Sequence, residues 1–108
     1  RWYAAGWALT QQRRHAEAVG AYRAALAADP AHQPAWNNLG WTLAALGFPA
    51  LGVPALERAV ALRPDDGLAR ANLAWARAAL PGAGASGAAV PGATAPLPAP
   101  AGGTTPRP

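Results

Sequence analysis

Apolar and small residues recur along the first 80 positions at the spacing of an α-helix. One stripe with the spacing i, i+3, i+4 and i+7 consists of Trp36, Leu39, Gly40 and Leu43. An earlier stripe with helical spacing consists of Ala18, Tyr22, Ala25 and Leu26. Residues at these intervals share one face of a helix. The earlier helix is expected to end at Asp29-Pro30, because a residue before proline is pushed out of the helical conformation. The pattern predicts an all-α chain with no strand.

The helical pattern itself repeats after 34 residues. Three tryptophans stand at this interval, namely Trp7, Trp41 and Trp75. The same interval relates Trp2 to Trp36, Gly6 to Gly40, Leu9 to Leu43, Ala25 to Ala59 and Pro30 to Pro64. A period of this length indicates repeats of a whole supersecondary unit. We therefore predict a solenoid of helix-turn-helix repeats with five helices.

The repeated unit resembles the tetratricopeptide repeat, whose pattern is W-x2-L-G-x2-Y followed by small, aromatic, Ala and Pro positions over 34 residues. The matching residues here are Trp36, Leu39, Gly40, Leu43, Gly52, Leu56, Ala59 and Pro64. The resemblance implies about two and a half units within residues 1–80: a first repeat over 1–32, a second over 33–64 and a capping helix over 65–80. It also implies that Trp2 and Trp36 are core residues.

Two prolines depart from the family pattern in the second helix of the second repeat. Pro49 is harmless if it occupies the first helical position. An interior Pro54 removes a backbone donor and clashes with the preceding turn. The sequence therefore predicts that this helix begins late or kinks near Pro54.

The third unit has charged residues where the earlier units are apolar. Arg70 stands at the position of Trp36, and Arg77 stands at that of Leu43. Charged residues suit a face left in water, and Asp66-Gly67 offers an N-cap for the helix. This helix is predicted to cap the array, as repeat proteins require for solubility.

The composition changes after Leu80. Residues 81–108 are mainly Pro, Ala, Gly and Thr, and Arg107 is their one charged residue. Such a composition predicts a disordered or polyproline-like C-terminal tail with no core of its own.

The net charge of +4 first suggests a nucleic-acid partner. However, the nine arginines are scattered, with Arg13 and Arg14 as the one adjacent pair. Nucleic acid is therefore disfavoured, although an RNA-binding helical repeat stays an alternative. The absence of cysteine excludes disulfides and thiolate sites and leaves the compartment open. No apolar run is long enough to predict a membrane span in this stretch.

No catalytic or metal-binding constellation is recognisable. His15 and Glu17 are two positions apart, so a helix points them in different directions, and no third metal ligand lies near. Thr10 and Ser86 have no base beside them that would make a nucleophile. No glycine-rich phosphate loop is present. We expect no catalytic residue, no metal and no cofactor, and hence a non-enzymatic protein.

A binding surface is the remaining candidate site. The resemblance implies that the first helices of successive repeats line a concave groove, whose candidate peptide-binding residues are Tyr3, Trp7, Asn37, Asn38, Trp41, Asn72 and Trp75. A clamp for a terminal carboxylate is disfavoured, because only Asn38 fits the family's pattern for it and the cationic partners are missing. The opposing interpretation of the tryptophans is that their indoles only pack between helices.

The sequence thus predicts a protein-protein interaction scaffold that binds a peptide segment of a partner in the groove. A polyproline II peptide advances roughly 9 Å per turn, and neighbouring helices are about 8 to 10 Å apart. A proline-rich partner, or the chain's own Thr94–Pro100, would therefore suit a tryptophan ladder. The first alternative is the docking module of a larger enzyme such as a transferase. With fewer than three complete repeats, self-association is a further expectation.

Overall fold

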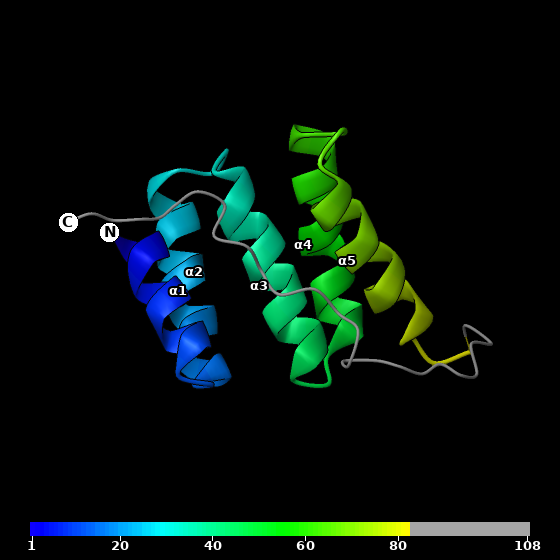
Figure 1. Ribbon diagram of the computed structural model, residues 1–108, viewed down its shortest axis with the longest axis horizontal. Coiled ribbons are helices and arrows are strands. Elements are labelled where there is room, and N and C mark those ends of the chain that lie inside the picture. Colours follow the sequence, from blue (N-terminus) through cyan, green and yellow to red (C-terminus); the bar gives the residue numbers. More distant parts are fainter. Residues whose placement is uncertain (83–108) are drawn as a thin grey trace.

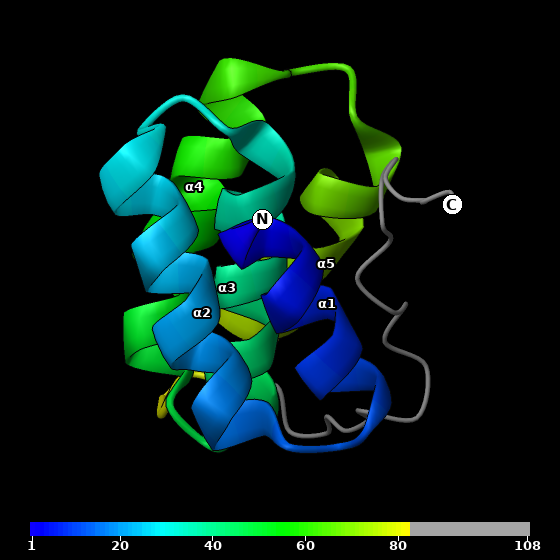
Figure 2. The same cartoon turned by 90° about the vertical axis from the view of Figure 1, so that its left-hand side faces the viewer.

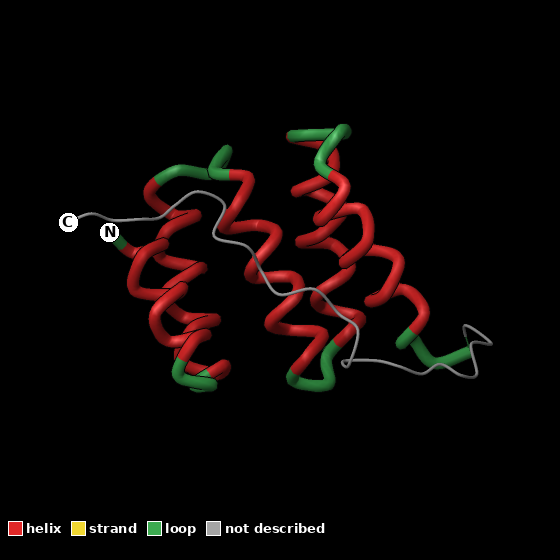
Figure 3. The backbone as a smooth tube through the Cα atoms, viewed as in Figure 1, coloured by secondary structure: helices red, strands yellow, loops and turns green. Residues whose placement is uncertain are grey.

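The computed structural model describes residues 1–82 as five α-helices without a strand in that range (Figure 1). Their bounds are α1 Trp2–Gln11, α2 His15–Ala28, α3 Gln33–Ala45, α4 Pro49–Leu62 and α5 Gly67–Ala78. Short turns join them, and successive helices pack in pairs (Figure 3). The predicted all-α fold of five helices is confirmed. Most of the predicted tail, residues 83–108, lies outside the described residues.

The helices form two layers, with α3 at the centre. A view along the array places α2 and α4 on one side and α1 and α5 on the other (Figure 2). Helix α3 packs against each of the other four helices. Between Gln33 and Ala44, every residue except Pro34 and Trp36 is buried. The middle of the array is therefore its best-covered part.

The core follows the apolar stripes that the sequence predicts. Its larger cluster consists of Ala18, Tyr22, Ala25, Leu26, Ala35, Leu39, Leu43 and Ala55. A second cluster under α5 consists of Ala44, Leu56, Leu73 and Ala76. Much of this core is alanine, so the helices approach one another closely. At the crossing of α3 and α4, a methyl group added to Gly40 would overlap the Leu56 side chain and lie 2.8 Å from the carbonyl oxygen of Gly52.

The turns between repeats are held in the same way each time. The indole Nε1 of Trp36 donates to the carbonyl oxygen of Pro30 at 2.7 Å. One repeat later, the guanidinium Nη1 of Arg70 donates to the carbonyl oxygen of Pro64 at 2.9 Å. Arg70 therefore keeps the hydrogen bond of the tryptophan that it replaces, while its side chain lies at the exposed surface, as the sequence predicts.

The N-terminus of α5 is capped as predicted. A carboxylate oxygen of Asp66 accepts from the backbone amides of Leu68 and Ala69. Its other oxygen accepts from the Gln33 side chain at 2.7 Å, which ties the start of α5 to the start of α3. His32, one repeat before Asp66, caps α3 by accepting from the amide of Ala35.

Of the two effects expected of Pro54, a late start of the helix is not observed, whereas a kink near Pro54 stays a prediction. Helix α4 begins at Pro49, which occupies its first position, and continues through Pro54 to Leu62. Pro54 and Ala50 both lie at the exposed surface. The proline ring therefore faces solvent, and the Ala50 carbonyl that loses its helical donor can be hydrated. The cost of the proline is reduced because it stands on the outer face.

The prediction that Trp2 is a core residue is also wrong, since 49 % of its surface is exposed. Its repeat partner Trp36 is partly buried, bonded to the Pro30 turn and approached by the Arg58 guanidinium at 6.0 Å from the ring centroid. Trp2 instead has the Arg1 guanidinium over its ring, at 5.9 Å from the centroid.

Arg13 adopts a conformation that favours glycine. Its φ is 64°, and its counterpart in the second repeat, Gly47, has a φ of 99°. A side chain in this region costs about 1 kcal/mol. We expect Arg13→Gly to raise the free energy of unfolding by about that amount, as measured by urea denaturation. Gly47→Ala should lower it, and an Arg13→Gly variant less stable than the parent chain would contradict this account.

Candidate functional site

All seven candidate groove residues lie on the layer formed by α1, α3 and α5, but they differ in accessibility. The buried ones are Asn37, Asn38, Trp41 and Asn72. The partly exposed ones are Tyr3, Trp7 and Trp75. The layer therefore presents aromatic side chains at its two outer helices, whereas its polar candidates lie inside the protein.

The three asparagines belong to one buried hydrogen-bond network. The Asn72 side-chain amide donates to Asn37 Oδ1 at 3.0 Å, and the Asn37 amide donates to Asn38 Oδ1 at 3.0 Å. The Asn38 amide donates in turn to the hydroxyl oxygens of Tyr3, at 3.0 Å, and Tyr22, at 3.4 Å. This network links α5, α3, α1 and α2. Its asparagines join the repeats to one another and have no side-chain surface to offer a ligand.

The network continues into the first repeat through Tyr22. The hydroxyl groups of Tyr22 and Thr10 are 2.9 Å apart, and Thr10 also donates to the carbonyl oxygen of Gly6 at 2.9 Å. Burial raises the pKa of both Tyr3 and Tyr22, with the proximity of the two hydroxyls adding to the effect at Tyr3. Both phenols therefore stay protonated and uncharged at ordinary pH. Neither Tyr22 nor Thr10 could be assigned to this network from the sequence, because their positions in the helical pattern indicate only that they pack in the core.

Two of the three repeated tryptophans stack on each other. The Trp41 and Trp75 ring centroids are 6.0 Å apart with an angle of 25° between the planes. This spacing is shorter than the roughly 9 Å turn of a polyproline II helix, so the pair forms one aromatic surface instead of two steps of a ladder. Within residues 1–82, Trp7 makes no ring contact with this pair, although it lies on the same layer.

In a ladder of three tryptophans, Trp7 would lie beside Trp41. In the structure, His15 lies there instead. Its imidazole meets the Trp41 ring edge-on at 5.9 Å between centroids. The counterpart of His15 in the second repeat is Pro49, so the repeat pattern gave no sign of this contact. His15 Nδ1 and Trp41 Nε1 are both buried without a hydrogen-bond partner in the described part of the chain. Trp41 is thus enclosed from two sides, by α2 and by α5.

The burial of His15 predicts a pH dependence of stability. Desolvation, with a smaller contribution from the Arg13 charge, lowers the pKa of His15 below its ordinary value. Between the folded-state pKa and the ordinary value of about 6.5, the unfolded chain binds more protons than the folded chain. The free energy of unfolding should be highest above about pH 6.5 and should decrease as the pH falls toward the folded-state pKa.

Urea denaturation of the full chain at a series of pH values between 8 and 5 would measure this effect. The variant His15→Gln, which cannot titrate, should show a weaker decrease over the same window. Parallel curves for the two proteins would contradict a role for His15. The difference between the curves isolates the contribution of His15.

Several charged side chains of residues 1–82 are held by partners of their own. Arg14 forms an exposed ion pair with Glu17 at 2.7 Å, and Arg77 forms another with Glu57 at 3.1 Å. Helix α3 contains no charged residue, and Arg70 is bonded to the Pro64 turn. Arg14, Arg70 and Arg77 are thus each bonded to a neighbouring protein group, and the central helix of the layer carries no charge.

Residues 1–82 contain no group of three side chains arranged to bind a metal ion. Within the same range, no helix has the length and apolar character needed to cross a membrane. His15 and Glu17, considered together in the sequence analysis, face different neighbours: His15 contacts Trp41, and Glu17 pairs with Arg14. The accessible features of this site are therefore aromatic and apolar.

Comparison with known proteins identifies the repeats. Two models of the tetratricopeptide repeat match the chain, one over residues 1–42 and the other over residues 33–66. No curated protein sequence and no solved structure matches it significantly.

Proposed function

Because the chain belongs to the tetratricopeptide repeat family, whose repeats are generally protein-protein interaction modules, we propose that it binds an extended segment of a partner protein on the layer of α1, α3 and α5. The observation that carries this proposal is the partly exposed Trp75 stacked on the buried Trp41. An aromatic side chain held in place before binding contributes contact area without losing side-chain freedom.

The environment of the aromatic pair supports an apolar contact. Tryptophan is among the residues that contribute most to binding energy at protein interfaces. Trp75 and Trp7 are partly exposed at the two outer helices of the layer. The asparagine network fixes α1, α3 and α5 relative to one another. The segment that this surface would recognise is extended and carries apolar or proline side chains.

Peptide selection followed by a titration tests the proposal. A random peptide library would be selected against the full chain, and the affinity of the selected peptides would be measured by tryptophan fluorescence. We expect Trp75→Ala to weaken binding by about 30-fold, as is typical of a central interface residue. Trp2→Ala is the matched control, because Trp2 is exposed but lies at the first residue of α1, away from the stacked pair.

Equal weakening by Trp2→Ala and Trp75→Ala, or no selected peptide at all, would contradict the proposal. A synthetic peptide with the sequence of Thr94–Pro100 would test the proline-rich class directly. Circular dichroism of each variant would show whether its helices are retained.

The distribution of charge favours a protein partner over RNA. A phosphate backbone requires arginines gathered along one surface, whereas α3 carries none and Arg14, Arg70 and Arg77 are engaged with Glu17, the Pro64 carbonyl and Glu57. A salt-dependent shift of an RNA oligonucleotide on addition of the protein would favour the RNA alternative. The proposed peptide surface is equally compatible with a docking role within a larger enzyme, which only the full reading frame would decide.

A further inference from the structure

The turn before α4 carries an apolar patch that the first repeat lacks. Three of the four large hydrophobic side chains exposed on residues 1–82 lie here, namely Leu46, Phe48 and Leu51. More than half of the surface of Phe48 and of Leu51 is in contact with solvent, at 54 % and 55 %. We call these three residues the turn patch.

The first repeat holds a polar cluster at the same three positions. The residues 34 positions earlier are Gln12, Arg14 and Glu17. Arg14 pairs with Glu17 at 2.7 Å and donates to the Gln12 side chain at 3.0 Å. The repeat fold therefore accepts hydrated polar groups at these positions and does not need apolar ones. Exposed apolar side chains at all three positions indicate that something covers the turn patch.

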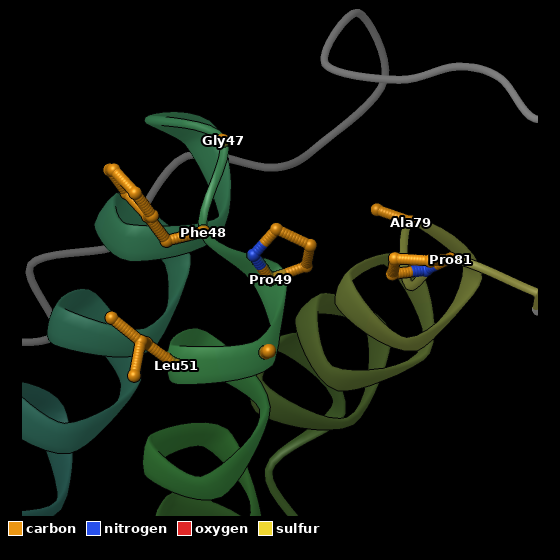
Figure 4. Close-up of a pocket in the computed structure, with 7 residues that line it drawn as sticks. Gly47, Phe48, Pro49, Leu51, Ala79 and Pro81 are labelled. Atoms are coloured by element: carbon orange, nitrogen blue, oxygen red, sulfur yellow. The ribbon is translucent and has the colours of Figure 1, made fainter.

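An apolar hollow joins the turn patch to the point where the chain leaves α5. The hollow has a volume of about 320 Å³, and Pro49, Ala79 and Pro81 are among the residues that line it. Pro49 faces Ala79 and Pro81 across the hollow, while Phe48 and Leu51 lie on the other side of the first turn of α4 (Figure 4). Apolar surface thus extends from the end of α5 around the start of α4.

We propose that the turn patch is the docking site of the chain's own segment 90–98. Pro81 lines the hollow and lies two positions before residue 83. Residues 83–108 are therefore connected to the folded part of the chain at the edge of the apolar surface. The only two apolar side chains in residues 83–108 larger than proline are Val90 and Leu97. The eight Cα–Cα steps from Gly82 to Val90 span up to roughly 27 Å when extended, so Val90 can reach beyond the point where Pro81 lines the hollow.

The chemistry of segment 90–98 matches the turn patch. Neither contains a charged residue, and Leu97 lies between Pro96 and Pro98. Proline-rich segments bind surfaces with exposed aromatic side chains, which Phe48 provides here. A short tether also gives the segment an effective concentration in the millimolar range, above that of a free partner. This proposal concerns a different surface from the peptide-binding layer and does not depend on it.

Disulfide trapping in the full chain tests the proposal, because the chain contains no cysteine. The variant Ala50→Cys/Ala99→Cys places one thiol at the hollow and one beside segment 90–98. Glutathione disulfide at low protein concentration should oxidise the two thiols to an intramolecular disulfide, with release of two molecules of reduced glutathione. The loss of free protein thiols would measure the rate of closure. Adding Leu97→Asp should slow closure at least about tenfold, since a carboxylate would have to be buried.

A second variant gives the turn patch two of the polar residues that the first repeat has at the same positions. Phe48→Arg/Leu51→Glu reproduces the Arg14 and Glu17 pair at exposed positions, so the helices should be retained. It should slow closure as much as Leu97→Asp does. Closure rates unaffected by both changes would overturn the proposal. Disulfides that form mainly between chains, in a yield rising with protein concentration, would overturn it in favour of a second copy as the occupant.

Discussion

Gly40→Ala is expected to lower the free energy of unfolding by about 3 kcal/mol or to prevent folding, because α3 and α4 would have to separate. The added methyl group would overlap Leu56 and approach the Gly52 carbonyl oxygen to 2.8 Å and the Leu56 amide nitrogen to 3.0 Å. Two of these three neighbours are backbone atoms, which cannot move aside without displacing a helix. Urea denaturation followed by circular dichroism would measure the loss.

Gly20→Ala is the matched control for this substitution. Gly20 also lies inside a helix, α2, but an added methyl group there has no neighbour within 4 Å. Alanine is the better helix former by about 1 kcal/mol, so this variant should be more stable than the parent chain. Similar destabilisation by both variants would show that helix contact at Gly40 is not the cause.

Asn38→Leu is expected to lower the free energy of unfolding by about 3 kcal/mol through the loss of the buried network. The Asn37 amide would lose its acceptor, and the hydroxyls of Tyr3 and Tyr22 would lose a shared donor. Leucine has the same number of side-chain heavy atoms as asparagine, so the substitution leaves no cavity and removes the polar partners. Thermal and urea denaturation would both report it.

Thr42→Val is the control for Asn38→Leu. Thr42 is fully buried like Asn38, but its hydroxyl donates only to the Asn38 carbonyl oxygen of its own helix. Valine preserves the shape, so the cost should be about 1 kcal/mol, the net value of one hydrogen bond. An Asn38→Leu cost no larger than that of Thr42→Val would mean that the network does not stabilise the contacts between repeats.

The helices and core of residues 1–82 could be predicted from the sequence because their signals are local and occur twice. Periodicity selects the stripe containing Tyr22 and the stripe containing Leu39, and the 34-residue interval shows that both belong to one architecture. The early start of α4 and its passage through Pro54 could not be predicted, because the cost of an interior proline depends on whether its ring and the Ala50 carbonyl face solvent. That information depends on how the helix packs, which the sequence interval does not contain.

The candidate site was predictable as a layer but not in its details. The family pattern places Trp7, Trp41 and Trp75 on the first helices, and the structure agrees. The family pattern does not reveal that His15 contacts Trp41 or that the asparagines form hydrogen bonds with one another. The sequence of a helix does not show whether an asparagine faces water or a buried amide. Only the pairing of side chains between repeats separates the two cases.

The hydrogen bond from Arg70 to the Pro64 carbonyl shows that two different side chains can hold the same kind of turn. Within the array, an indole satisfies the turn and also supplies apolar surface to the neighbouring helix. In the third unit, a guanidinium satisfies the same turn and stays hydrated. Turn geometry and the apolar character of the helix surface are thus specified separately, and exchanging one side chain can change that surface without altering the connection between the repeats.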